Sequence, residues 1–112
     1  MEILNLLWGN ATSRTVTITT NGAPYNLTGK TVRFTIKRSI DLNNTNDEDA
    51  LILKDITVHS NPSNGETMLT LTGNDMKFIN EGVYYADFRI LEDNKNTEML
   101  KVIVSKVVTK GV

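Results

Sequence analysis

Residues 80–90 read NEGVYYADFRI, a turn that leads into a strand with alternating apolar side chains. Asparagine and glycine before the apolar positions favour a turn. The apolar side chains that follow stand at every second position and therefore share one face of an extended chain: Tyr84, Ala86, Phe88 and Ile90. We expect an inner strand over 82–90, with Phe88 in the core.

The turn and the tyrosine together have the form of a tyrosine corner, a structural signature of Ig-like sandwiches. In this motif the phenol hydroxyl of Tyr84 bonds back to nearby backbone, and Gly82 opens the strand. The alternative is that Tyr84 is an ordinary core residue.

The same alternation recurs along the chain. It predicts strands over 14–19, 31–37 with Phe34 inward, and 67–71, separated by turns at Asn21-Gly22 and at 61–65. The turn at Asn21-Gly22 predicts that strands 14–19 and 31–37 pair or lie close. Threonine suits half-exposed strands and asparagine suits turns, and the chain has 15 Thr and 13 Asn.

Three stretches are harder to interpret. Apolar positions in 50–58 change face, which predicts a bulge or a break in the strand near Lys54-Asp55. Residues 74–80 lack alternation and predict one short helical turn. The register of the strand within 99–108 stays open, because Val102 and Ile103 compete for the inner face. The sequence thus predicts an all-β protein, an antiparallel Ig-like β-sandwich of about seven or eight strands.

Length and composition predict a single domain over 1–112. Twelve basic and 13 acidic residues give a formal charge of −1, which favours neither nucleic acid nor a membrane surface as partner. The absence of cysteine excludes disulfides and thiolate metal sites. The N-terminus has no features of a signal peptide.

Candidate chemistry is sparse. His59 is the only histidine, and we expect a solvated strand residue because no second imidazole or positioned nucleophile accompanies it. The acidic stretch 41–49 fails as an EF-hand, since Asn46 replaces the required glycine and Ile52 the bidentate glutamate; a weak, irregular calcium site there stays open. We expect no catalytic, cofactor-binding or metal-binding residues.

The N-terminal segment 1–9 is crowded with large apolar residues. A strand buries only alternate residues against its own core, so a partner would cover the rest. The candidate interface residues of this docking strand or arm are Ile3, Leu6, Leu7 and Trp8. The alternative is an edge strand whose faces are both covered by the domain's own loops.

Several segments resemble the N-terminal Ig-like domain of phage baseplate upper proteins. These are 14–18, 24–37 with its Leu27-Thr28-Gly29 turn, the turn at Gly65 with 69–72, and 82–88, so the resemblance spans most of 14–108. Asn26 and Lys30 stand where that family usually has aspartate and alanine.

The resemblance implies a non-enzymatic assembly domain in the virion tail, which binds other tail or baseplate proteins or copies of itself. The alternative is an adhesin-like or carbohydrate-binding sandwich module. Such a module would stack sugars on exposed aromatic residues, for which Trp8, Tyr25 and Tyr85 remain.

Overall fold

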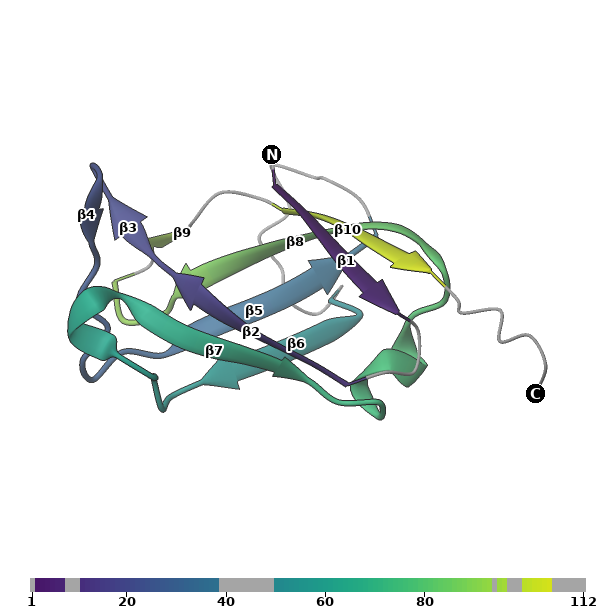
Figure 1. Ribbon diagram of the computed structural model, residues 1–112, viewed down its shortest axis with the longest axis horizontal. Coiled ribbons are helices and arrows are strands. Elements are labelled where there is room, and N and C mark those ends of the chain that lie inside the picture. Colours follow the sequence, from purple (N-terminus) through teal and green to yellow (C-terminus); the bar gives the residue numbers. More distant parts are fainter. Residues whose placement is uncertain (1, 8–10, 39–49, 94, 97–99, 106–112) are drawn as a thin grey trace.

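The computed structural model describes residues 2–7, 11–38, 50–93, 95–96 and 100–105, and these build a nearly all-β protein (Figure 1). Seven strands have five residues or more: β1 (Glu2–Leu7), β2 (Thr12–Thr17), β5 (Val32–Lys37), β6 (Ile52–Ile56), β7 (Glu66–Leu71), β8 (Gly82–Ile90) and β10 (Leu100–Ser105). Three strands have two residues: β3 (Thr19–Thr20), β4 (Ala23–Pro24) and β9 (Lys95–Asn96). The predicted all-β class is confirmed.

Within the described residues, two short 3-10 turns accompany the strands, η2 (Pro62–Asn64) and η3 (Asp75–Phe78). The second is the helical turn predicted within 74–80. Thr72 and Asp75 hold its start reciprocally: the Thr72 N–H donates to the Asp75 carboxylate at 2.8 Å, and the Asp75 N–H donates to the Thr72 hydroxyl at 3.2 Å. This exchange satisfies backbone donors that a helix start leaves unpaired.

The main sheet has the strand order β1-β10-β8-β5-β6, with β9 paired to β8, and a second sheet contains β2 and β7. β1 runs parallel to β10, and the other pairs are antiparallel. Strands β10, β8, β5 and β6 follow the order G, F, C, C′ of an immunoglobulin variable-type sheet, and β2 with β7 takes the places of B and E. Buried side chains from both sheets form one cluster, so the sheets pack face to face as a sandwich.

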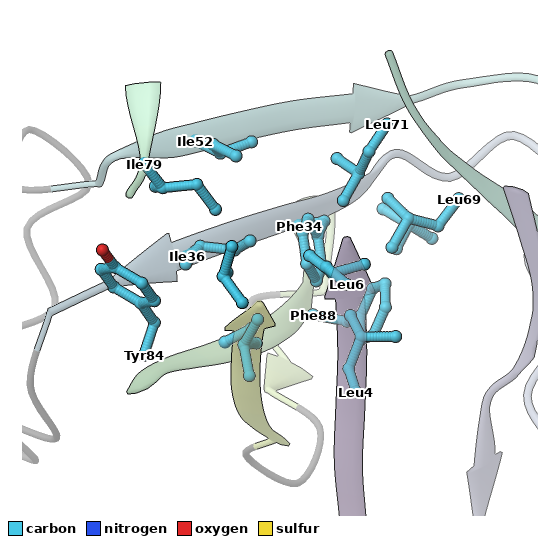
Figure 2. Close-up of a cluster of buried hydrophobic side chains, with 14 of the residues drawn as sticks. Leu4, Leu6, Phe34, Ile36, Ile52, Leu69, Leu71, Ile79, Tyr84 and Phe88 are labelled. Carbon is cyan, nitrogen blue, oxygen red and sulfur yellow. The ribbon is translucent and has the colours of Figure 1, made fainter. Parts of the chain in front are cut away.

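The core is centred on Phe34 of β5 and Phe88 of β8. These residues are direct cross-strand partners, and their ring centroids lie 5.0 Å apart. Figure 2 shows Leu4 and Leu6 of β1 in the same cluster. Phe34 has no exposed surface, and the same holds for Leu27, Val32, Ile36, Thr67, Leu71, Met76, Ile90 and Val102.

The segments 14–19 and 31–37 were predicted to pair or lie close. They do not pair, because β2 pairs with β7, whereas β5 lies between β8 and β6 in the other sheet. The turn at Asn21-Gly22 instead joins the short strands β3 and β4. Nor is there a bulge at Lys54-Asp55, since β5 and β6 pair in an unbroken register.

The change of face in 50–58 has a simple explanation. Ile52 is buried, whereas Leu53 is 41% exposed on the outer face and Val58, beyond the strand, is 85% exposed. The apolar residues of this stretch are therefore not all core residues. Within β10, pairing with β8 places Val102 and Val104 inward and settles the open register.

Candidate contact surface

Tyr84 lies at the start of β8 with its ring buried and its hydroxyl bonded to backbone. The hydroxyl donates to the carbonyl oxygen of Asn80 at 2.9 Å, and the residue is 8% exposed. A Cβ atom on Gly82 would lie 3.6 Å from the ring, in ordinary van der Waals contact. This is the hydrogen-bond pattern of a tyrosine corner.

The turn at Leu27 and Gly29 anchors the chain before β5. Leu27 is fully buried, and its N–H donates to the Pro62 carbonyl at 2.8 Å, which ties this turn to the 61–65 turn. The Lys30 N–H donates back to the Leu27 carbonyl at 2.9 Å. The residues that we predicted as structural thus lie in the core or in the turns that surround it.

His59 is not the solvated strand residue that we expected. It follows β6 outside any strand and is half-buried. Its Nε2 lies 2.7 Å from the Lys30 carbonyl oxygen, and its Nδ1 lies 2.9 Å from the hydroxyl of Thr67, which has no exposed surface. A carbonyl can only accept, so Nε2 carries a proton, and in the neutral ring Nδ1 then accepts from the Thr67 hydroxyl. Both ring nitrogens are engaged in holding two segments together.

Glu92 and Asp93 lie in the turn after β8 and connect it to residues 25–31 through hydrogen bonds and an ion pair. Glu92 accepts from the Thr31 N–H at 2.7 Å and from its hydroxyl at 2.9 Å. Asp93 accepts from the Tyr25 hydroxyl and pairs with the Lys30 ammonium at 3.0 Å. The hydrogen bonds from Thr31 lower the pKa of Glu92, and the bond to Asp93 raises the pKa of Tyr25.

The carboxylates of this acidic turn are hydrogen-bonded or ion-paired to Tyr25, Lys30 and Thr31. In the part of the chain that the structure describes, no three His, Asp or Glu side chains are placed to hold a metal ion. The acidic stretch 41–49, with its open question of calcium, lies outside the described residues. Within the same described part, no helix is long and apolar enough to cross a membrane.

The parallel pairing of β1 with β10 places alternate residues of the predicted interface segment on opposite faces of the main sheet. Leu4 is 4% exposed and Leu6 is 2% exposed, so both side chains lie in the core of the domain, and a role of Leu6 in an interface stays a prediction. Its side chain points inward because β1 is a strand of the main sheet. Ile3 points outward and is 51% exposed. The Leu7 side chain and Trp8 lie outside the described residues.

The outer face of the main sheet carries an apolar patch at its β1 end, which we call the outer patch: Ile3, Val83, Tyr85 and Ile103. Val83 is 49% exposed and lies directly opposite Ile103. Tyr85 lies opposite Lys101, which in turn lies opposite Ile3. The patch therefore runs across three adjacent strands, with lysine side chains beside it.

The other end of this face is charged and internally paired. The Arg33 guanidinium donates to both carboxylate oxygens of Asp55, at 2.7 and 2.9 Å, and holds the pKa of Asp55 below its usual range. The Thr35 hydroxyl donates to Asp87 at 2.9 Å. The outer face thus combines an ion-paired end with an apolar end.

Sequence reasoning missed most of the outer patch. Alternation in 82–90 already implied that Val83 and Tyr85 point away from the core. The outward orientation of Ile103 depends on the register of β10, and that of Ile3 depends on the position of β1 in the sheet. Neither can be obtained from a single strand.

Comparisons with known proteins agree with this architecture. The family model of the BppU N-terminal domain matches residues 9–111. Among solved structures, the N-terminal domain of phage TP901-1 ORF48 is similar at a TM-score of 0.54 and 20% sequence identity, over 93% of this chain and 85% of that chain. At this identity the likeness shows the fold alone.

A weaker likeness is to the NK cell receptor Nkp44, a triggering partner in natural cytotoxicity. Its TM-score is 0.44 at 13% identity, over 93% of this chain and 97% of that chain. No curated protein matches the chain.

Proposed function

The chain belongs to the family of BppU (baseplate upper protein) N-terminal domains, and on this basis we propose that it joins other proteins in the tail baseplate of a phage. The family supports a structural role in the baseplate. The observation that carries the proposal is the match over residues 9–111, which includes both sheets of the sandwich from β2 onward.

The outer patch is the contact surface that fits this function best. Val83 and Ile3 are each about half exposed, and they share one face of three adjacent strands with Tyr85 and Ile103, with Lys101 between Ile3 and Tyr85. Apolar and aromatic side chains of this kind dominate the energetics of protein interfaces. Lys37 and Lys101, which lie opposite Tyr85, would select a partner surface with acidic groups at its rim.

The domain acts by binding and catalyses no reaction in this proposal. Its one histidine and its acidic turn are engaged in holding loops together. With a formal charge of −1, the chain has no electrostatic preference for nucleic acid or anionic lipid, so its partners are proteins.

A carbohydrate-binding role is less well supported. Tyr25 is bonded to Asp93 beyond the far end of β8, whereas Tyr85 lies near the start of that strand. Five residues of extended chain, roughly 17 Å, separate Tyr85 from Ile90 at the end of β8, and Asp93 lies in the turn beyond. This separation argues against one stacking platform that uses both aromatic rings. A glycan array is the direct test, and specific sugar binding would favour this alternative.

The test of the baseplate role uses virions of a phage whose copy of the gene is deleted and supplied in trans. We expect the wild-type chain in purified particles by mass spectrometry, with antibody label at the tail tip in electron micrographs. Val83→Asp should reduce incorporation at least tenfold while the soluble protein stays folded. Thr70→Asp, an exposed position on β7, is the matched control and should incorporate normally.

Complete baseplates that lack the chain would contradict the proposed function. Normal incorporation of Val83→Asp would leave the role standing but remove the outer patch as the contact surface.

A further inference from the structure

β1 is the last strand of the main sheet, and its second edge has no partner strand among the residues that the structure describes. In a strand paired on one side only, the N–H and C=O groups of alternate residues point away from the sheet. These groups form a ready template for one more strand.

Two of the other edge strands, β6 and β2, carry features that discourage strand addition. On β6, Lys54 pairs with Asp75 at 2.8 Å and Asp55 pairs with Arg33 at 2.7 Å. On β2, Arg14 is exposed although it lies opposite the buried Leu69. Ion-paired charges on an edge and charged residues at inward positions are devices that block pairing between sheets. β1 has neither a charged residue nor a proline between positions 3 and 7.

After Glu2, the sequence of β1 is symmetric in character about Asn5. It reads Ile3-Leu4-Asn5-Leu6-Leu7, so the same class of residue stands at equal distances on either side of the asparagine. When two such strands run antiparallel about a two-fold axis at Asn5, Leu4 lies opposite Leu6 of the other copy, and Ile3 lies opposite Leu7. Apolar residues then meet apolar residues, and the polar residue meets itself.

We propose that β1 pairs antiparallel with β1 of a second copy of this chain, with the two-fold axis at Asn5. The inference rests on the proposed function, because assembly into a baseplate requires contacts between domains. Leu4 and Leu6 are buried in the core, so the pairing joins the two cores along one continuous sheet. The exposed Asn5 amides face each other on the outer side and can bond to one another.

The same pairing extends the outer patch. Ile3 is its member on β1, at the join between the two copies. Patches from both copies would then face the same side of one sheet, and together they offer a baseplate partner about twice the area of one copy.

A cysteine at the axis tests the register directly, because the chain has no cysteine of its own. Residues directly opposite in an antiparallel pair have Cα atoms about 4.5 to 5.5 Å apart, within the range that a disulfide spans. Under mild oxidation we expect Asn5→Cys to form a covalent dimer at least tenfold faster than Thr15→Cys. Thr15 is the matched control, an exposed outward position on β2. Equal rates for the two variants would overturn the proposal.

Charged substitutions at Asn5 distinguish pairing between two copies of the chain from binding to another protein. Asn5→Lys and Asn5→Glu should each weaken dimerisation at least tenfold in sedimentation velocity, since like charges oppose across the axis. An equimolar mixture of the two should restore the dimer. Unchanged melting temperatures would show that each variant is folded, as expected for an exposed side chain. Dimers unaffected by either variant, or a wild-type chain that stays monomeric at millimolar concentration, would overturn the pairing.

These outcomes do not depend on the virion experiment. A monomeric chain that is incorporated into baseplates contradicts the β1 pairing alone. A dimer that is absent from virions contradicts the proposed function alone.

Discussion

The hydroxyl of Tyr84 donates a hydrogen bond to the carbonyl oxygen of Asn80, four residues back along the chain. The bond closes the corner through which η3 leads into β8, the strand that pairs with both β5 and β10. A single side chain therefore fixes where the central strand of the main sheet begins.

Removal of this hydroxyl should destabilise the domain measurably. We expect Tyr84→Phe to lower the free energy of unfolding by about 1 kcal/mol, because the Asn80 carbonyl loses its donor. Tyr85→Phe is the control, since Tyr85 points to the outer face and its hydroxyl should contribute little. Chemical denaturation of both variants checks this. Equal midpoints would show that the corner contributes nothing to stability.

Gly65 and Gly29 should respond very differently to the same substitution. Both have a positive φ, 72° and 73°. A Cβ on Gly65 would lie 2.4 Å from the Ile18 carbonyl oxygen, whereas a Cβ on Gly29 would meet nothing within 4 Å. Gly29→Ala carries only the left-handed backbone penalty and should cost about 1 kcal/mol. Gly65→Ala adds a backbone clash and should cost about 3 kcal/mol or more, or prevent folding. A similar loss for both in thermal melts would mean that the turn at 61–65 can shift away.

The contact between His59 and Thr67 should be energetically coupled. His59→Ala leaves the buried Thr67 hydroxyl without its acceptor, which should cost about 1 to 3 kcal/mol. Once Thr67→Val has removed the hydroxyl, the same histidine substitution should cost less, by about 1 kcal/mol. A double-mutant cycle from urea denaturation measures the difference. Strictly additive losses would show that the hydrogen bond contributes no net stability.

Acid should weaken the domain through its bound carboxylates. Burial raises the pKa of Asp75, but the hydrogen bonds from Lys54 and Thr72 outweigh it, and the pKa lies below its usual range. A lowered pKa in the folded state means that the ionised form stabilises the fold. This contribution is complete above the ordinary aspartate pKa of about 4 and is lost as the pH falls through the lower folded value.

The variant Asp75→Asn makes this contribution visible. It should be less stable than the wild type at about pH 7, and the difference should shrink toward about pH 2, where the wild-type carboxyl is also protonated. Denaturation midpoints for both proteins across this range provide the measurement. A constant difference would assign the effect to lost packing rather than to charge.

Local sequence accounts for the strands and for the centre of the core. The alternation around Phe34 and Phe88 specifies extended chain with one apolar face, because neighbouring side chains on a strand point to opposite sides. Glycine and asparagine before Tyr84 specify the corner in the same local way. These features depend on residues within a few positions of one another, so they can be read from the chain.

The tertiary structure alone decides which strands pair and which of two apolar sets faces the core. Ile3 and Leu6 are both large and apolar, yet Leu6 is buried and Ile3 is exposed, because the pairing of β1 with β10 sets the orientation of the whole strand. His59 likewise finds its partners in Lys30 and Thr67, on segments that only the fold brings beside it. Strand pairing joins residues far apart along the chain, and the period of a single strand carries no information about which distant strand will lie beside it.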